Sequence, residues 1–132
     1  MAKIAINIAT GSLQQEEMIV GIDLGTTNSL VAIIHPDTKK PVVLKEHDGN
    51  ALVPSILHFA EGGNVLVGDE AKKHLIDAPQ QTVFSVKRLM GKSYNDIRDY
   101  SSFFTYKVID DQTESLVKIQ VGERFYSPVE LS

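Results

Sequence analysis

The stretch GIDLGTTNS, residues 21–29, constrains the fold most, because it places an acid, a glycine and two threonines at the end of a strand-like run. Residues 18–24 are apolar and β-branched, which predicts a buried strand. Residues 28–35 have the same character and predict a second strand, antiparallel to the first. The residues between them form a tight turn, so this part of the chain is expected to be a strand, a turn and a strand.

The polar turn at residues 23–27 could be either a plain hairpin turn or a phosphate-binding turn. In a plain hairpin, the Asp23 carboxylate would accept hydrogen bonds from its own turn. In a phosphate cradle, Gly25 would let backbone N–H groups approach an anion, and the hydroxyls of Thr26 and Thr27 would add donors. A carboxylate beside a phosphate then requires a hydrated divalent cation between them. The four residues therefore suggest a Mg-nucleotide site, although neither a Walker loop nor a Rossmann fingerprint is present.

Composition excludes several other classes of function. The chain has 132 residues, enough for one small domain, and a net charge of -4, which argues against nucleic acid as a partner. It has no cysteine, so disulfides and thiolate metal sites are excluded, and a reducing, cytoplasmic location is expected. The four histidines lie too far apart for a local metal motif. No apolar run approaches the ~20 residues of a membrane span, so no membrane association is expected.

Short strands and helices are predicted for the remainder of the chain. Residues 41–47 predict a third strand, and residues 52–59 an edge or bulged strand because they contain Pro54. Further strands are predicted at residues 65–68, 103–110 and 115–121, and residues 122–126 are predicted to form a last turn and a short strand. Helices are predicted from an Asp69 cap to about residue 76, over residues 82–91 with Gly91 as the stop, and from a Ser93 cap to about residue 100. The fold class is therefore mixed, α/β overall and α+β in its local arrangement.

The two ends of the chain carry separate signals. Ile4, Ile6 and Ile8 alternate, which indicates either a short edge strand or a loosely ordered extension over residues 1–17. Residues 127–130, SPVE, form a capping box with proline at the first helical position. That signal announces a helix, yet the chain stops at Ser132. We therefore expect a helix cut short and a chain that is part of a longer protein.

The motifs taken together resemble a known family. GIDLGTTNSLVA resembles the first phosphate loop of the actin, sugar-kinase and heat-shock ATPase superfamily. The stretches LVPSILHF, VLVGDEAKKH, SVKRLMGKS and YSPVELS follow in the order and approximate spacing of the DnaK-type seventy-kilodalton heat-shock chaperones. The resemblance covers residues 18–132. The N-terminal extension, TTNSLVA and SVKRLMG are more similar to HscA, the branch that assists iron–sulfur cluster assembly.

The resemblance implies a role for each residue of the motifs. Asp23 would lie near Mg²⁺ and contact it through water. Residues 25–28 (Gly25, Thr26, Thr27, Asn28) would form the first phosphate loop for ATP or ADP. Lys87 would be the catalytic lysine that reaches the γ-phosphate and steadies the attacking water. Without the resemblance, Lys87 would be interpreted as a solvated charge on an amphipathic helix. A bound K⁺ is a further implication of the family.

The resemblance also implies an architecture and partners. The fold would be actin-like: residues 18–50 would begin the base of the first lobe, residues 51–126 would form much of its small upper subdomain, and residues 127–132 would start the cut helix. The parent protein would be an ATP-dependent chaperone whose partners are a J-domain co-chaperone, an extended client peptide and, for the HscA branch, an iron–sulfur scaffold protein.

Two rival interpretations stay open. A sugar-kinase-type phosphotransferase would use a substrate hydroxyl in place of water, although KRLMG argues against it. The chain as given could also be a non-catalytic fragment, because half a cleft cannot preorganise both sides of a phosphoryl group. On that interpretation it binds Mg-ATP weakly or not at all, does not turn it over, and self-associates through exposed apolar strands.

Overall fold

The computed structural model describes residues 4–7, 12–15, 18–112 and 116–132, which fall into two compact units. The first unit comprises Met1–Asp23 and Leu30–Ala51, and the second comprises Leu24–Ser29 and Leu52–Ser132. The turn between the two opening strands therefore belongs to the second unit, although the strands themselves lie mostly in the first.

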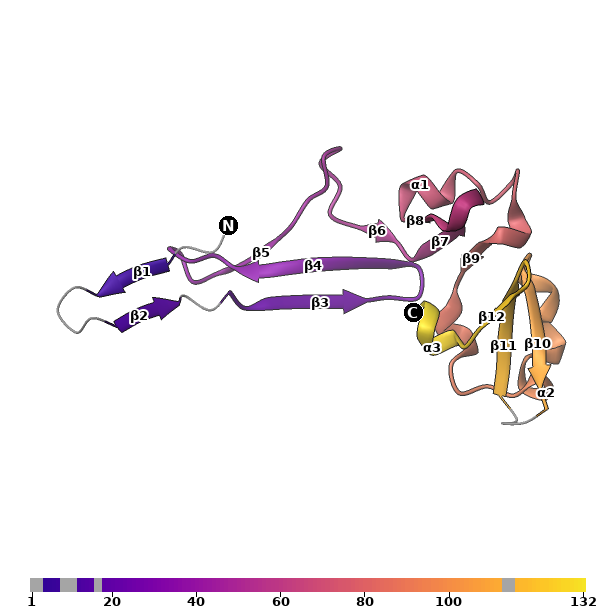
Figure 1. Ribbon diagram of the computed structural model, residues 1–132. Coiled ribbons are helices and arrows are strands. Elements are labelled where there is room, and N and C mark those ends of the chain that lie inside the picture. Colours follow the sequence, from indigo (N-terminus) through magenta and orange to yellow (C-terminus); the bar gives the residue numbers. More distant parts are fainter. Residues whose placement is uncertain (1–3, 8–11, 16–17, 113–115) are drawn as a thin grey trace. The chain divides into compact units, whose positions relative to one another are not determined.

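The first unit is built from antiparallel strands (Figure 1). Strands β1 (Ile4–Asn7) and β2 (Ser12–Gln15) pair with each other, and β3 (Val20–Leu24), β4 (Asn28–Ile34) and β5 (Pro41–Val43) lie in that order in a second sheet. The predicted antiparallel pairing of the two opening strands is thus present, but the burial predicted for residues 18–24 is wrong, because every residue of β3 is exposed. Of the alternating isoleucines, Ile4 and Ile6 lie in β1, and Ile8 lies outside the described residues.

The third strand is shorter than predicted. It ends at Val43 rather than at residue 47, because the chain turns back on itself soon afterwards. The N–H of Glu46 donates to the Asn50 carbonyl at 2.8 Å, and the N–H of Gly49 donates to the Glu46 carbonyl at 3.0 Å. Gly49 has φ +86°, a backbone conformation that glycine adopts without steric cost.

The run that contains Pro54 is divided into two strands. β6 (Val53–Pro54) pairs with β4, and β7 (Ile56–Phe59) lies between β8 (Val65–Val67) and β9 (Thr82–Phe84). Proline has no N–H to give to a ladder, so the change of partner at Ser55 is where a break is least costly. The single edge or bulged strand predicted over residues 52–59 is therefore wrong, because two short strands take its place and β7 lies in the middle of its sheet.

The first predicted helix is wrong in its length and in its cap. Helix α1 spans only Asp69–Lys72, and its N-cap position is Gly68, at φ 71° and with no side-chain cap, rather than Asp69. The following residues form turns, in which the N–H of His74 donates to the Ala71 carbonyl at 3.0 Å. A Cβ on Gly68 would meet the Val53 side chain at 2.8 Å, so the tight entry to α1 requires glycine.

The predicted helix over residues 82–91 is also wrong for its first part. Thr82–Phe84 is strand β9, Ser85 has a left-handed backbone at φ 53°, and only Val86–Leu89 is helical, as the 3-10 turn η3. The apolar residues at helical spacing serve two elements instead of one. Val83 pairs with Leu57 in the sheet, whereas residues 86 and 89 share one side of a turn that has about three residues. Gly91, at φ 67°, ends the segment as predicted.

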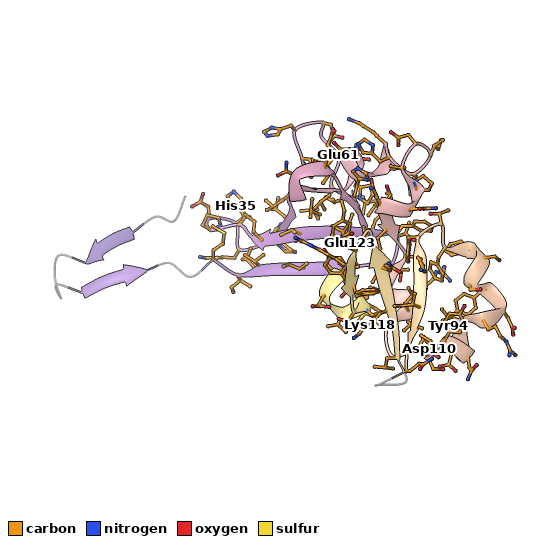
Figure 2. The ribbon with its side chains drawn as sticks, turned by 45° about the vertical axis from the view of Figure 1, so that its right-hand side comes forward. His35, Glu61, Tyr94, Asp110, Lys118 and Glu123 are labelled. Atoms are coloured by element: carbon orange, nitrogen blue, oxygen red, sulfur yellow. The ribbon has the colours of Figure 1, made fainter. Side chains whose placement is uncertain are left out.

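The last third of the chain follows the prediction more closely. Ser93 caps α2 (Tyr94–Ile97) with a complete capping box, and Ser127 does the same for α3 (Pro128–Leu131). Strands β10 (Lys107–Asp111), β11 (Leu116–Val121) and β12 (Arg124–Tyr126) form one antiparallel sheet. Figure 2 marks Tyr94, Lys118 and Glu123 in this region. The remaining 3-10 turns are η1 (Glu61–Gly63), η2 (Pro79–Gln81) and η4 (Arg98–Phe103). Residues 113–115 of the predicted hairpin turn lie outside the described residues.

One hydrophobic core holds the second unit together. It joins residues from β9, η3, α2, the segment between η4 and β10, and β11, namely Val83, Val86, Leu89, Ile97, Phe104, Tyr106, Val117, Ile119 and Val121. The Tyr106 hydroxyl donates to the Phe84 carbonyl at 2.6 Å, and burial raises the pKa of Tyr106. The core thus anchors η3, the turn that carries Lys87. No helix in the described part of the chain is long and apolar enough to cross a membrane.

Candidate functional site

The turn at residues 25–27 is tightly closed. A Cβ added to Gly25 would meet the Asn28 carbonyl oxygen at 2.1 Å, far inside any real contact, so only glycine fits this backbone. Gly25 and Thr26 are half-buried, whereas Thr27 and Asn28 are exposed. Asn28 is paired with Pro54 in the β4–β6 ladder, which fixes the end of the turn.

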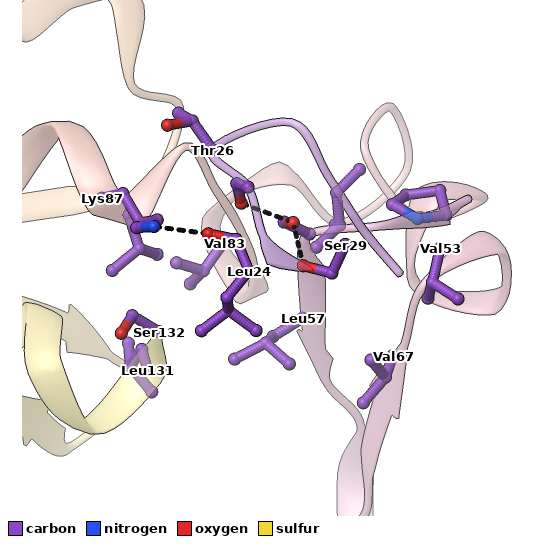
Figure 3. Close-up of a pocket in the computed structure, with 15 residues that line it drawn as sticks. Leu24, Thr26, Ser29, Val53, Leu57, Val67, Val83, Lys87, Leu131 and Ser132 are labelled. Atoms are coloured by element: carbon purple, nitrogen blue, oxygen red, sulfur yellow. Dashed lines mark hydrogen bonds between the residues drawn. The ribbon is translucent and has the colours of Figure 1, made fainter. Parts of the chain in front are cut away.

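Ser55, which lies between β6 and β7, binds the turn. Its hydroxyl donates to the Gly25 carbonyl at 2.8 Å, and its N–H donates to the Thr27 carbonyl at 2.9 Å. The Ser29 hydroxyl lies 2.9 Å from the Ser55 hydroxyl oxygen (Figure 3). All of these groups belong to the second compact unit, so the turn is held by the same body that contains the core.

Lys87 approaches the same turn from η3. Because Val86 and Leu89 are buried, Lys87 and Arg88 are left on the exposed side of this turn. The Lys87 ammonium donates a hydrogen bond to the Leu24 carbonyl, directly before Gly25 (Figure 3). The Arg88 guanidinium instead lies 5.7 Å from the centre of the Phe103 ring. The two neighbouring cations are therefore directed to different places.

A pocket of about 250 Å³ opens beneath the turn. Gly25, Thr26, Ser29, Ser55 and Lys87 supply its polar border. Apolar side chains from β6, β7, β8, β9, η3 and α3 also line it, including Val53, Leu57, Val67, Val83, Val86 and Leu131. An anion beside these polar residues would meet the Lys87 ammonium and the Thr26 hydroxyl, because the Ser55 hydroxyl donates its hydrogen to the Gly25 carbonyl. The apolar side chains around them lower the local dielectric, which strengthens electrostatic attraction.

The predicted site residues are thus only partly brought together. Gly25, Thr26 and Lys87 border one pocket, and Thr27 and Asn28 adjoin it along the chain with exposed side chains. Asp23 is the penultimate residue of β3, is exposed, and belongs to the first compact unit. Among the described residues, no group of three or more His, Cys, Asp or Glu side chains could hold a metal ion.

Sequence reasoning missed Ser55 and Ser29. Ser55 lies in an apolar run, directly after Pro54, and the prediction for this run rested on Pro54 alone. Its contact with the turn joins residues 30 positions apart, which no local pattern reveals. The serine that follows the strand-breaking proline was the available signal, because a polar residue at such a break is expected to have a partner.

A comparison with known families adds a separate line of evidence. Residues 19–132 match the family model described as "Hsp70 protein". The match therefore spans the second compact unit completely, together with most of the described residues of the first.

Proposed function

This chain belongs to the Hsp70 family, and we propose that it supplies one wall of that family's nucleotide site, with the turn at residues 25–28 and Lys87 facing the phosphates. The family consists of ATP-dependent chaperones, which bind ATP or ADP with Mg²⁺ and have an actin-like ATPase fold. The antiparallel sheets and short helices of this chain are compatible with that fold.

The shape of the turn is the observation that carries the proposal. Only glycine fits where the Asn28 carbonyl oxygen closes on residue 25, and this tight closure brings the backbone groups of the turn close together. Such turns accommodate phosphate because an anion accepts hydrogen bonds from backbone N–H groups and neighbouring hydroxyls. Thr26, at the border of the pocket, supplies one such hydroxyl, and the exposed Thr27 supplies another.

Lys87 supplies the positive charge that this site requires. Its hydrogen bond to the Leu24 carbonyl directs the ammonium group toward the turn, and an ammonium group has more N–H donors than one bond uses. Placed there, Lys87 would bind a phosphate oxygen and offset negative charge that builds up on a transferring phosphoryl group. Mg-ATP would contribute the reactive phosphoanhydride and the divalent charge.

Asp23 would assist through the metal ion rather than through the phosphate. A single exposed carboxylate does not make a metal cage, and the described residues contain no larger cluster of ligands. Mg²⁺ keeps several waters and is commonly held by one or two carboxylates together with substrate phosphates. We propose that Asp23 contacts those waters.

The test compares neighbouring cations. Ligand-detected NMR of the unsubstituted chain with Mg-ADP should show binding of roughly millimolar strength, since the groups named here amount to a few hydrogen bonds and one cation. Lys87→Ala should weaken binding by about tenfold, because it removes a charge-assisted bond. Arg88→Ala is the matched control and should bind within about twofold, because its guanidinium lies against Phe103. Equal losses from both variants would show that Lys87 acts only through net charge.

The proposed partners follow from the family and not from a surface of this chain. As part of an Hsp70 chaperone, the protein would work with a J-domain co-chaperone and an extended client peptide. Stimulation of ATP hydrolysis by a J-domain protein in the protein purified from its native host would support this, and hydrolysis that no J-domain protein alters would contradict it.

We further propose the HscA branch as the finer assignment. It rests on the motifs TTNSLVA and SVKRLMG and on the N-terminal extension. Disrupting the gene should then lower the activity of iron–sulfur enzymes in the host while leaving recovery of heat-denatured proteins intact. The reverse outcome would place the protein among the general chaperones.

A further inference from the structure

Ser55 lies where the chain passes from one sheet to another, between β6 and β7. β6 ends at Pro54 and pairs with β4, and β7 begins at Ile56 and pairs with β8 and β9. Ser55 is half-buried, borders the pocket and belongs to neither strand. Its backbone and side chain are therefore available for bonds outside the two ladders.

The direction of each hydrogen bond follows from counting hydrogens. The Ser55 hydroxyl has a single hydrogen, and it is donated to the Gly25 carbonyl at 2.8 Å. In the contact of 2.9 Å between the two hydroxyls, Ser29 must then be the donor and the Ser55 oxygen the acceptor. The result is a directed series from the Ser29 hydroxyl to the Ser55 hydroxyl to the Gly25 carbonyl, in which each bond polarises the next.

Ser55 thereby holds two carbonyl groups of the turn. Its hydroxyl holds that of Gly25 and its N–H holds that of Thr27, at 2.8 and 2.9 Å. A carbonyl oxygen repels a phosphate, because both carry negative charge. The Ser55 hydroxyl and N–H bind these two carbonyl oxygens and keep them directed toward Ser55. This favours a turn conformation suited to an anion.

From this geometry we infer that Ser55 is the positioning residue of the phosphate-binding turn: its hydroxyl and N–H fix the carbonyls of Gly25 and Thr27, and the Ser29 hydroxyl strengthens that hold. The inference rests on the proposed function, since it assigns to Ser55 the task of preparing the turn for the phosphates of Mg-ADP or Mg-ATP. Ser55 itself acts through the backbone of the turn.

Substitutions that remove or retain the hydroxyl test the inference. Ser55→Ala should weaken Mg-ADP binding roughly three- to tenfold, the effect of one hydrogen bond, and Ser55→Thr should restore it to within about twofold. Ser29→Ala should cause a smaller loss, because it removes the supporting donor alone. Ser101→Ala is the matched control: the Ser101 hydroxyl also donates to a backbone carbonyl, that of Arg98 at 3.1 Å, but at a distance from the pocket, and binding should not change.

A second measurement needs no nucleotide. The ¹³C resonance of the Gly25 carbonyl should shift in Ser55→Ala, return in Ser55→Thr and stay unchanged in Ser101→Ala, because that shift reports the hydrogen bond directly. A loss of general stability would not produce this pattern. If Ser55→Ala does not fold, Ser55→Cys carries the same test, since a thiol is a weaker donor.

The outcomes separate the two proposals. Failure of the unsubstituted chain to bind Mg-ADP would overturn the proposed function. Binding by the unsubstituted chain that Ser55→Ala leaves unchanged would overturn only the inference about Ser55. An equal loss in Ser55→Ala and Ser55→Thr would also overturn it, because the hydroxyl would then be irrelevant.

Discussion

Strands β3 and β11 have similar residues and opposite surroundings. Every residue of β3 (Val20–Leu24) is exposed, and Ile22 keeps 67% of its surface accessible. In β11 (Leu116–Val121), buried residues alternate with more exposed ones, and Ile119 is completely buried. The difference shows that apolar, β-branched composition makes a strand, whereas burial also requires a second layer against one face.

The comparison extends to the two compact units that contain these strands. The core of the second unit includes Val86, next to Lys87, and Leu89, and the turn at residues 25–28 belongs to the same unit. The first unit exposes apolar residues along its strands, among them Val20, Ile22, Val42 and Val43. We therefore expect the second unit to supply most of the free energy of folding and to contain the residues proposed to bind phosphate. The following predictions test this expectation.

The largest expected effect is a difference in stability between variants at Ile119 in β11 and at Ile22 in β3. Ile119→Ala should lower the free energy of unfolding by about 2–5 kcal/mol, because it leaves a cavity in the core. Ile22→Ala should change it by no more than about 0.5 kcal/mol, because the side chain is mostly exposed. Urea unfolding followed by circular dichroism measures both. Similar losses would mean that the first unit contains a core of its own.

The next effect contrasts two glycines of the opening strand and turn. Gly25→Ala should weaken Mg-ATP binding by about tenfold or more, because its Cβ would collide with the Asn28 carbonyl oxygen and force the turn open. Gly21→Ala should bind as the unsubstituted chain does, since its Cβ would lie 3.9 Å from the Ala32 carbonyl oxygen. Ligand-detected NMR measures both, and equal binding by the two variants would show that the closed turn is unnecessary.

A smaller effect concerns acid stability in the second unit. His58 is buried, stacks on His74 at 4.0 Å between ring centres, and shares a hydrogen bond of 2.9 Å with Thr82. Burial lowers the pKa of His58, the charge on His74 lowers it further, and Asp77 opposes the change. The folded state thus favours neutral His58. Its contribution to stability is complete above the ordinary pKa of 6.5 and is lost as the pH falls through the lowered folded-state value.

Unfolding at a series of pH values tests this sign. The free energy of unfolding should decline as the pH falls below about 6.5, and His58→Gln should flatten that decline. His47→Gln, at an exposed histidine, is the control and should leave the decline unchanged. Stability that rises on acidification over this range would contradict the prediction.

The smallest effects concern the short helix α2 and an ion pair near α1. Ser93→Ala should cost about 1 kcal/mol of unfolding free energy, because Ser93 accepts a hydrogen bond from the Asp96 N–H and completes a capping box. Lys73→Ala should cost less than about 0.5 kcal/mol, because its ion pair with Glu70 is exposed. Thermal unfolding distinguishes them, and the reverse order would show that surface charge contributes more than capping.

The sequence predicted features that depend on neighbouring residues. The hairpin at residues 20–34, the two serine caps and the β10–β11 pair are all local, and all are present in the structure. The helix predicted over residues 82–91 failed because the pairing of Val83 with Leu57 is a contact across the fold. Ser55 was missed for the same reason. In the site, the approach of Lys87 to the turn followed from family resemblance, since 63 positions separate it from Leu24.

The most direct test of the central claim is a titration of the ¹⁵N-labelled chain with Mg-ATP, followed by amide chemical shifts. If the turn and Lys87 hold the phosphates, the largest shifts should fall on residues 25–28 and on residue 87, and Lys87→Ala should abolish or greatly reduce them. Large shifts confined to other parts of the chain, or none at millimolar Mg-ATP, would contradict the account.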